Sequence, residues 1–229
     1  MPAIPTPSTY PVMRAVVVAH GDVDPDDLAH VRAADLIVAA DGGTETLARW
    51  GIEPHLVVGD LDSLGAERRA RLDPKIVERW PAEKDKTDTE LALERAVARG
   101  ATEIVLLGAL GGSRGDHAIA NILALGLDRG SAVPIRLVRG PLSMRVTRGG
   151  GTATLDGDPG GVVTLLALGG EASGITTDGL RYPLAGGTLL LGSSRGVSNE
   201  IARKGATVRV GSGLLLIVEG GTPEPQAKA

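Results

Sequence analysis

The chain has 229 residues and a hydrophobic content of 42%, which suits one large domain or two modest ones with packed cores. Its net charge of −4 and its lack of a concentrated basic run argue against nucleic acid as the main partner, because phosphate backbones are bound by clustered Lys and Arg. Its longest apolar runs are far shorter than the ~20 residues that cross a bilayer. Small molecules are therefore the expected partners, with no nucleic acid and no membrane.

The two ends of the sequence carry no pattern of a folded element. Residues 1–11 are rich in proline and lack the basic start and apolar core of a signal peptide, and residues 222–229 are of low complexity. Both are expected to be flexible tails. The chain has no cysteine, which rules out disulfides and thiolate chemistry and fits a reducing, cytoplasmic location.

In residues 12–142, short apolar runs alternate with helix-like segments. The runs are rich in Val, Ile and Leu without polar alternation, as in strands that are covered by helices on both faces. This rhythm predicts an open parallel α/β sheet. The expected strands are 15–19, 36–40, 56–58, 104–107 and 135–138.

Two helices can be placed in this half. Thr87 and Glu90 have the spacing of a capping box, which predicts a helix that continues to about Arg99. A second helix is predicted to begin near Asp116. The side chains expected on its buried face are Ile119, Ile122, Leu123 and Leu127.

In residues 143–221 the pattern changes to short alternating runs that are separated by glycine. Such a pattern predicts antiparallel β-structure, in a sandwich or barrel of about six to eight strands. The chain is therefore expected to contain two domains. The runs are 145–147, 152–155, 162–168, 188–191, 207–210 and 214–218.

Acidic side chains follow the predicted strands of the first half. Asp60 and Asp62 come directly after a strand that ends in Gly59, and Asp88 begins the helix that follows. Because the carboxyl ends of parallel strands share one edge of a sheet, these carboxylates are expected to converge. Mg²⁺ is the natural ion for such a set, since it takes one or two carboxylates together with water and phosphate oxygens. The alternative is that the acids only cap turns and helices.

Glycine-rich segments follow two other strands of the same predicted sheet. Asp41-Gly42-Gly43 allows a close backbone approach to a ligand, and residues 108–117 combine glycines with Arg114 and a helix start, which together suit an anion. For His117, a phosphate contact and a packing role are both open. The Walker A loop, the Gly-x-Gly-x-x-Gly motif after the first strand and the Gly-x-Ser-x-Gly elbow are absent from the sequence. P-loop kinases, typical NAD dehydrogenases and serine hydrolases are therefore disfavoured.

Taken together, these segments resemble the thiamine pyrophosphokinase family. The resemblance rests on the order of several motifs over nearly the whole chain from about residue 14 to residue 219. From the residues alone, the two motifs in the second half are only polar loops. The matching segments are 40–43, 58–64, 85–92, the Gly-Gly-Ser-Arg-Gly-Asp-His segment 111–117, 179–184 and 197–200.

The resemblance implies a Rossmann-like α/β nucleotide domain over residues 12–142 and a smaller β-sandwich over residues 143–221, which binds thiamine and forms a homodimer. It implies a pyrophosphotransferase that moves the pyrophosphoryl group of ATP to the hydroxyl of thiamine, giving thiamine diphosphate and AMP. The resemblance also implies that this reaction depends on Mg²⁺. Phosphoryl chemistry of this kind needs mainly positioning and charge neutralisation. For the proton of the hydroxyl, a cluster aspartate and a metal-bound water are both candidates.

The resemblance also assigns roles to single residues. The metal ligands are Asp60, Asp62, Asp85 and Asp88, and three of them, Asp60, Asp62 and Asp88, count as catalytic. The ATP-binding residues are Asp41, Gly42, Gly43, Lys86, Thr87, Arg114, Asp116 and His117. The thiamine-binding residues are Ser198, Asn199 and Tyr182.

Two departures from the family pattern keep other functions open. The segment from Gly111 to His117 is one residue longer than the usual motif. Some family members stack thiamine on a tryptophan in the second half, whereas both tryptophans here, Trp50 and Trp80, lie in the first half. A pyrophosphokinase that acts on another heterocyclic alcohol, such as a pterin, is therefore an alternative. A sensor that binds a nucleotide or thiamine diphosphate without turnover is another, although it would have little need for several metal ligands.

Overall fold

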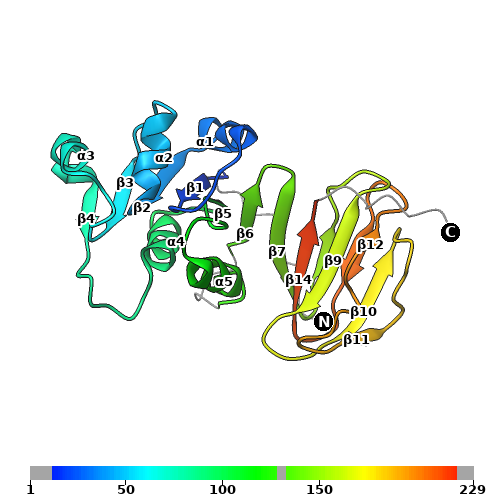
Figure 1. Ribbon diagram of the computed structural model, residues 1–229. Coiled ribbons are helices and arrows are strands. Elements are labelled where there is room, and N and C mark those ends of the chain that lie inside the picture. The colour runs from blue at the N-terminus through cyan, green and yellow to red at the C-terminus, as the bar shows by residue number, and fades with distance from the viewer. Residues whose placement is uncertain (1–11, 128–132, 221–229) are drawn as a thin grey trace.

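The computed structural model describes residues 12–127 and 133–220, and the predicted tails at 1–11 and 222–229 lie outside the described residues. The fold is mixed α/β, with one ten-stranded sheet and a separate four-stranded sheet (Figure 1). The strand order of the large sheet is β12-β9-β14-β7-β6-β5-β1-β2-β3-β4. Within the described residues, each helix is too short or too polar to span a membrane.

Six neighbouring strands of the large sheet run parallel, as the sequence predicts. β1 lies in the middle and pairs with β2 on one side and β5 on the other. All five predicted strands are confirmed, and β4 is an additional short strand at the edge. The strands are β1 (Arg14–Val18), β2 (Leu36–Ala40), β3 (Leu56–Gly59), β4 (Val77–Arg79), β5 (Glu103–Leu107) and β6 (Ile135–Arg139).

Helices cover both faces of this parallel part. Ala15 and Val17 of β1 belong to the same hydrophobic cluster as Leu91 and Ala96 of α4, whereas Val16 packs into the cluster on the other face, which contains Leu47 of α2. This double burial explains why the strands lack polar alternation. The helices are α1 (Leu28–Arg32), α2 (Gly43–Arg49), α3 (Ala66–Arg71), α4 (Asp88–Ala98) and α5 (Gly115–Ala124), with short 3₁₀ helices η1 (Pro25–Asp27) and η2 (Pro74–Ile76).

The second half of the chain is antiparallel, as predicted. β7 (Leu142–Arg148) turns back along β6 and continues the large sheet through β14 (Leu214–Glu219), β9 (Val162–Ala167) and β12 (Asn199–Glu200). The four-stranded sheet packs against this part through one hydrophobic cluster, which contains Leu165 and Ile217 from the large sheet and Val208 from the small one. Its strands are β11 (Gly187–Leu189), β10 (Ala172–Asp178), β13 (Thr207–Arg209) and β8 (Thr152–Thr154).

Two strands of this half were not predicted from the sequence. β10 contains Gly174 in a left-handed conformation, and its pairing with β11 shifts register between Ala172 and Ile175. A bulge of this kind breaks the two-residue alternation by which a strand is recognised. β12 has only two residues, which is too short for any periodic signal.

The buried face predicted for the helix after Gly115 was wrong for three of its four members; the fourth, Ile122, is partly buried and packs against the hydrophobic core. Ile119, Leu123 and Leu127 are 62%, 56% and 44% exposed. The side chain of Asn121 is buried instead, and its amide donates a hydrogen bond of 2.9 Å to the carbonyl of Ala109. This bond turns the Asn121 side of α5 toward the sheet, and therefore Ile119 and Leu123 face outward, whereas Leu127 lies beyond the end of the helix.

Candidate active site

A cavity of about 400 Å³ lies at the carboxyl ends of the parallel strands. Its walls come from the segments that follow β1, β2 and β5, together with the starts of α4 and α5. Because β1 lies between β2 and β5, the connections after β1 and β5 leave to opposite sides of the sheet. Such a switch in strand order opens a crevice where α/β proteins bind their ligands.

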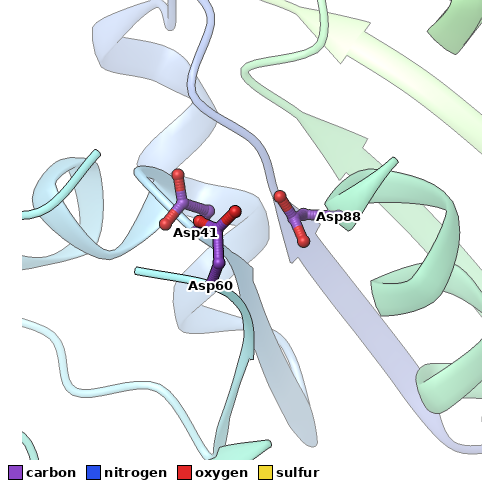
Figure 2. Close-up of side chains that lie close together, drawn as sticks. All are labelled: Asp41, Asp60 and Asp88. Atoms are coloured by element: carbon purple, nitrogen blue, oxygen red, sulfur yellow. The ribbon is translucent and has the colours of Figure 1, made fainter. Parts of the chain in front are cut away.

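Three carboxylates meet at this edge. Asp41 follows β2, Asp60 follows β3 and Asp88 is the first residue of α4, and Figure 2 shows their side chains turned toward a common space. One carboxylate oxygen from each lies within 4.8 Å of the others. These three residues are called the acid triad below. Each supplies hard oxygen atoms, and the spacing suits a divalent cation.

Gly59 makes this convergence possible. It has a φ of 149°, and a Cβ atom built on it would lie 3.0 Å from the Cβ of Asp41 and 3.2 Å from the carboxyl carbon of Asp88. A side chain at this position would therefore occupy the space where the carboxylates meet. Gly59 therefore contributes to the site by leaving this space free for the carboxylates.

The backbone around Asp60 separates it from its neighbour Asp62. Leu61 adopts a left-handed conformation with a φ of 67°, and its side chain is buried in the hydrophobic core. This turn directs Asp60 to the acid triad and leaves Asp62 exposed. The Oδ1 atom of Asp60 accepts a hydrogen bond of 3.1 Å from the backbone N–H of Asp62, which fixes the turn.

A lysine that sequence reasoning missed, Lys84, lies against the acid triad. Its Nζ atom is 3.1 Å from Oδ1 of Asp88 and 3.9 Å from Oδ2 of Asp60. Burial raises the pKa of Asp88; Lys84 opposes this shift, and the negative charges of Asp41 and Asp60 add to it. The contact with Asp88 is an ion pair without the alignment of a hydrogen bond, since Asp88 Oδ1 is buried with no aligned donor.

Glycines keep the rest of the cavity wall close to the backbone. A Cβ atom on Gly21 would lie 2.5 Å from the carbonyl oxygen of Gly108, and one on Gly42 would lie 2.2 Å from Nδ1 of His20. Gly111 and Gly112 both have a positive φ, of 75° and 72°. These positions bring backbone groups to the cavity surface, where a phosphate can approach them.

Arg114 and Asp116 form an exposed ion pair at the start of α5. Arg114 donates hydrogen bonds of 2.9 Å and 2.6 Å to the two carboxylate oxygens of Asp116. This pairing lowers the pKa of Asp116 to about 2. Arg114 and His117 both line the cavity at the N-terminal end of α5, where unpaired N–H groups and the helix dipole favour an anion.

A second, smaller cavity of about 290 Å³ lies in the antiparallel half. Asn199 is 7% exposed and links the two sides of this cavity. Its side-chain amide donates a hydrogen bond of 2.7 Å to the carbonyl of Tyr182, and its side-chain oxygen accepts one of 3.1 Å from the N–H of Tyr182. Ser198 adopts a left-handed conformation with a φ of 57°. Both residues and the exposed ring of Tyr182 line this cavity.

Comparison with known proteins places this arrangement in a family. Residues 29–135 match the model "Thiamin pyrophosphokinase, catalytic domain" and residues 153–215 match "Thiamin pyrophosphokinase, vitamin B1 binding domain". The crystal structure of thiamin pyrophosphokinase from Geobacillus thermodenitrificans is 31% identical, with a TM-score of 0.78 over 93% of this chain and 99% of that one. The chain belongs to the thiamine pyrophosphokinase family.

A curated relative agrees with this assignment. The thiamine pyrophosphokinase of Bacillus subtilis (strain 168) is 28% identical over 85% of this chain and 91% of its own length. The crystal structure of thiamine pyrophosphokinase from the same species has a TM-score of 0.79 over 90% of this chain and 98% of that one. The resemblance on which the sequence interpretation rests is therefore confirmed, and both halves of the chain belong to the family fold.

The structure brings together only part of the metal set that the family resemblance implies. Asp60 and Asp88 meet, and the third member of the triad is Asp41, which the resemblance placed with the nucleotide. Asp62 and Asp85 are exposed and do not belong to this group in the described residues. Their role as ligands stays a prediction.

Of the nucleotide-binding residues that the resemblance implies, only some line the large cavity. Asp41, Thr87, Arg114 and His117 line the large cavity. Gly42 and Gly43 lie just behind the wall, against His20 and Val18. Lys86 pairs with Glu94 at 2.6 Å, and Asp116 pairs with Arg114.

His20 and Asn121 also line the large cavity and were not among the predicted site residues. His20 follows the central strand, so its place at the sheet edge can be predicted from the sequence even though no role was assigned to it. Lys84 gave no such signal, because it lies in an alternating charged run, Glu83 to Lys86, and nothing in such a run distinguishes a half-buried side chain from an exposed one.

Proposed function

We propose that the acid triad holds Mg²⁺ and that the glycine-lined cavity holds ATP, so that its pyrophosphoryl group passes to the hydroxyl of thiamine and AMP leaves. Membership of the family makes the chain an ATP-dependent thiamine diphosphokinase. One observation supports the assignment of the site: Asp41, Asp60 and Asp88 converge, and Asp41 and Asp88 line a cavity together with several glycines, Arg114 and His117.

The acid triad fits a magnesium ion on its own geometry. Oδ1 of Asp41 is buried and has no hydrogen-bond partner, and a buried polar atom without a partner costs about 1–3 kcal/mol. A bound cation would satisfy it, and would add to the ion pair that Oδ1 of Asp88 makes with Lys84. The ion would neutralise phosphate charge during the transfer. Asp62, which follows the turn at Leu61, and Asp85 are proposed to join the coordination shell of the ion when ATP is bound.

The rest of the cavity suits the phosphates of ATP. Gly111 and Gly112 bring the backbone to its surface, and Arg114 and His117 stand at the N-terminal end of α5. Together these groups favour an anion. Their work is to orient the phosphate chain so that the β-phosphorus faces the acceptor hydroxyl. Thr87 lines the same cavity, and we propose that it contacts a phosphate oxygen there.

We assign thiamine to the second cavity, which Ser198, Asn199 and Tyr182 line. The segments that build this cavity lie beside β9 and β12, and those that build the ATP site lie around β1, β2 and α4, at different ends of the molecule in Figure 1. Transfer requires the two substrates to touch. A homodimer in which one copy's thiamine cavity faces the other copy's ATP cavity meets this requirement.

The finer description of the fold belongs with this proposal. The parallel half is proposed to act as a Rossmann-like nucleotide domain over residues 12–142, and the antiparallel half as a β-sandwich over residues 143–221. The predicted boundary falls within β7, so the large sheet continues across it. The cytoplasmic location is proposed from the absence of cysteine.

Identifying the nucleotide product tests the proposal. Purified protein with ATP, Mg²⁺ and thiamine is expected to form AMP and thiamine diphosphate in equal amounts, and chelation of Mg²⁺ is expected to stop the reaction. A pterin alcohol offered in place of thiamine serves as the control for the acceptor. ADP as the sole nucleotide product, a preference for the pterin, or tight binding of ATP with no AMP under any metal condition would contradict the proposal.

A further inference from the structure

Lys84 is held in an unusual position for a lysine. It lies in the loop between β4 and α4, and only 11% of its side chain is exposed. Its Nζ atom donates a hydrogen bond of 3.0 Å to the carbonyl of Pro81 and lies beside Asp88 and Asp60. Lysine side chains are rarely buried to this extent unless they are paired, because burial removes rotamer freedom and water from the ammonium group.

The charges around Lys84 explain why it stays there. Three carboxylates within 4.8 Å of one another repel strongly when they are ionised and share one space. The ammonium group sits 3.1 Å from one of them and 3.9 Å from a second, so it offsets part of this repulsion. The bond to Pro81 fixes the loop on which it is carried.

We infer that Lys84 is a positioning residue that acts as a built-in cation: it keeps Asp60 and Asp88 together when no divalent ion is bound, and it competes with that ion for their oxygens. The inference rests on the proposed function, because it takes the acid triad as the magnesium site. The lysine thereby holds the ligands near their working arrangement. It also limits how tightly the ligand-free chain binds Mg²⁺.

Two charge-changing variants test this inference. Lys84→Met keeps an unbranched stem of similar length and removes the charge, whereas Lys84→Arg keeps the charge. Lys75→Met, at an exposed lysine on η2, is the matched control. Titration of Mg²⁺ into each ligand-free protein by calorimetry gives the affinity. Thermal unfolding in EDTA and in excess Mg²⁺ gives the stability with and without the ion.

Lys84→Met is expected to bind Mg²⁺ about tenfold more tightly than the wild type, because a positive charge within 4 Å of the ligands is gone. Its Tm in EDTA is expected to fall by about 3 °C and to return to the wild-type value in excess Mg²⁺. Lys84→Arg and Lys75→Met are expected to stay within about twofold of the wild-type affinity. If circular dichroism shows that Lys84→Met does not fold in EDTA, Lys84→Gln takes its place.

The outcomes separate this inference from the proposed function. Equal or weaker Mg²⁺ binding by the neutral variants overturns the competition, and an unchanged Tm in EDTA overturns the role of holding the acid triad. A wild-type protein that forms no AMP contradicts the proposed function instead. The EDTA measurement contains no metal, and it therefore tests the lysine even in that case.

Discussion

Gly59 leaves room for the side chain of Asp41, because a Cβ atom on Gly59 would lie 3.0 Å from the Cβ of Asp41. This distance is shorter than the great majority of contacts that real Cβ atoms make, so Asp41 would have to move. The glycine comes from the end of β3 and the aspartate from the end of β2, which pair in parallel. The register of two neighbouring strands thus decides whether the acid triad can form.

Gly59→Ala is expected to lower activity more than stability. The new methyl group would push Asp41 and Asp88 apart, and the residue would be forced into a φ of 149° that alanine rarely adopts. We expect a loss of about 1–3 kcal/mol in the free energy of unfolding and a fall in kcat of about 10²-fold. Gly65→Ala is the control, because a Cβ atom at Gly65 meets open space. Equal activities in the two variants would show that the packing at Gly59 is unimportant.

Neutralising the aspartates that follow β3 tests the metal assignment. Asp60→Asn and Asp62→Asn are each expected to lower kcat by about 10²-fold or more, since both are proposed to act on charge that develops in the transition state. The fold is expected to survive, as judged by circular dichroism. Asp73→Asn, an exposed helix cap of η2, is the matched control. Near-normal turnover in Asp60→Asn and Asp62→Asn would refute the proposal that they bind the metal.

Asn199 is expected to support the thiamine cavity through Tyr182. Asn199→Ala removes both hydrogen bonds to the Tyr182 backbone and a third to the N–H of Glu200. We expect a loss of about 2 kcal/mol in the free energy of unfolding by denaturant and a rise in the KM for thiamine with the KM for ATP unchanged. Asn199→Asp, which keeps the acceptor and loses the donor, should be intermediate. A parallel rise in both KM values would argue against a local effect.

The ion pairs of Asp156 with Arg145 and Arg136 are expected to make the stability of the protein depend on pH. Burial acts to raise its pKa, but Arg145 and Arg136 together lower it below its usual value. A depressed pKa stabilises the folded state above the unfolded value of 3.8, and this contribution disappears as the pH falls through the lower folded value. Asp156→Asn is therefore expected to be about 1 kcal/mol less stable at pH 7.

The gap between Asp156→Asn and the wild type should close as the pH falls below 3.8. Unfolding by denaturant at a series of pH values gives both curves. Asp158→Asn is the control, because Asp158 pairs with Lys204 where both side chains are about four-fifths exposed. Parallel curves for the wild type and Asp156→Asn would exclude the ion pairs of Asp156 as a source of pH-dependent stability.

Much of the fold could be predicted from local patterns. The parallel strands are apolar on both faces because helices cover both, and Thr87 caps α4 by accepting a hydrogen bond of 3.1 Å from the N–H of Glu90. Such features depend on residues near one another in the chain. The outward face of α5 was not predictable, because a hydrogen bond from Asn121 to a loop twelve residues earlier sets its rotation.

The sequence by itself determined the chemistry of this protein: carboxylates, glycines and an arginine placed after strands that share one sheet edge, in an order that belongs to one family. Only the tertiary structure decided which of them meet. Asp41 joins Asp60 and Asp88, while Asp62 faces outward and Lys84 is drawn in. The physical reason is that strand register, the left-handed turn at Leu61 and the loop bond to Pro81 set side-chain directions, and no spacing along the chain specifies those.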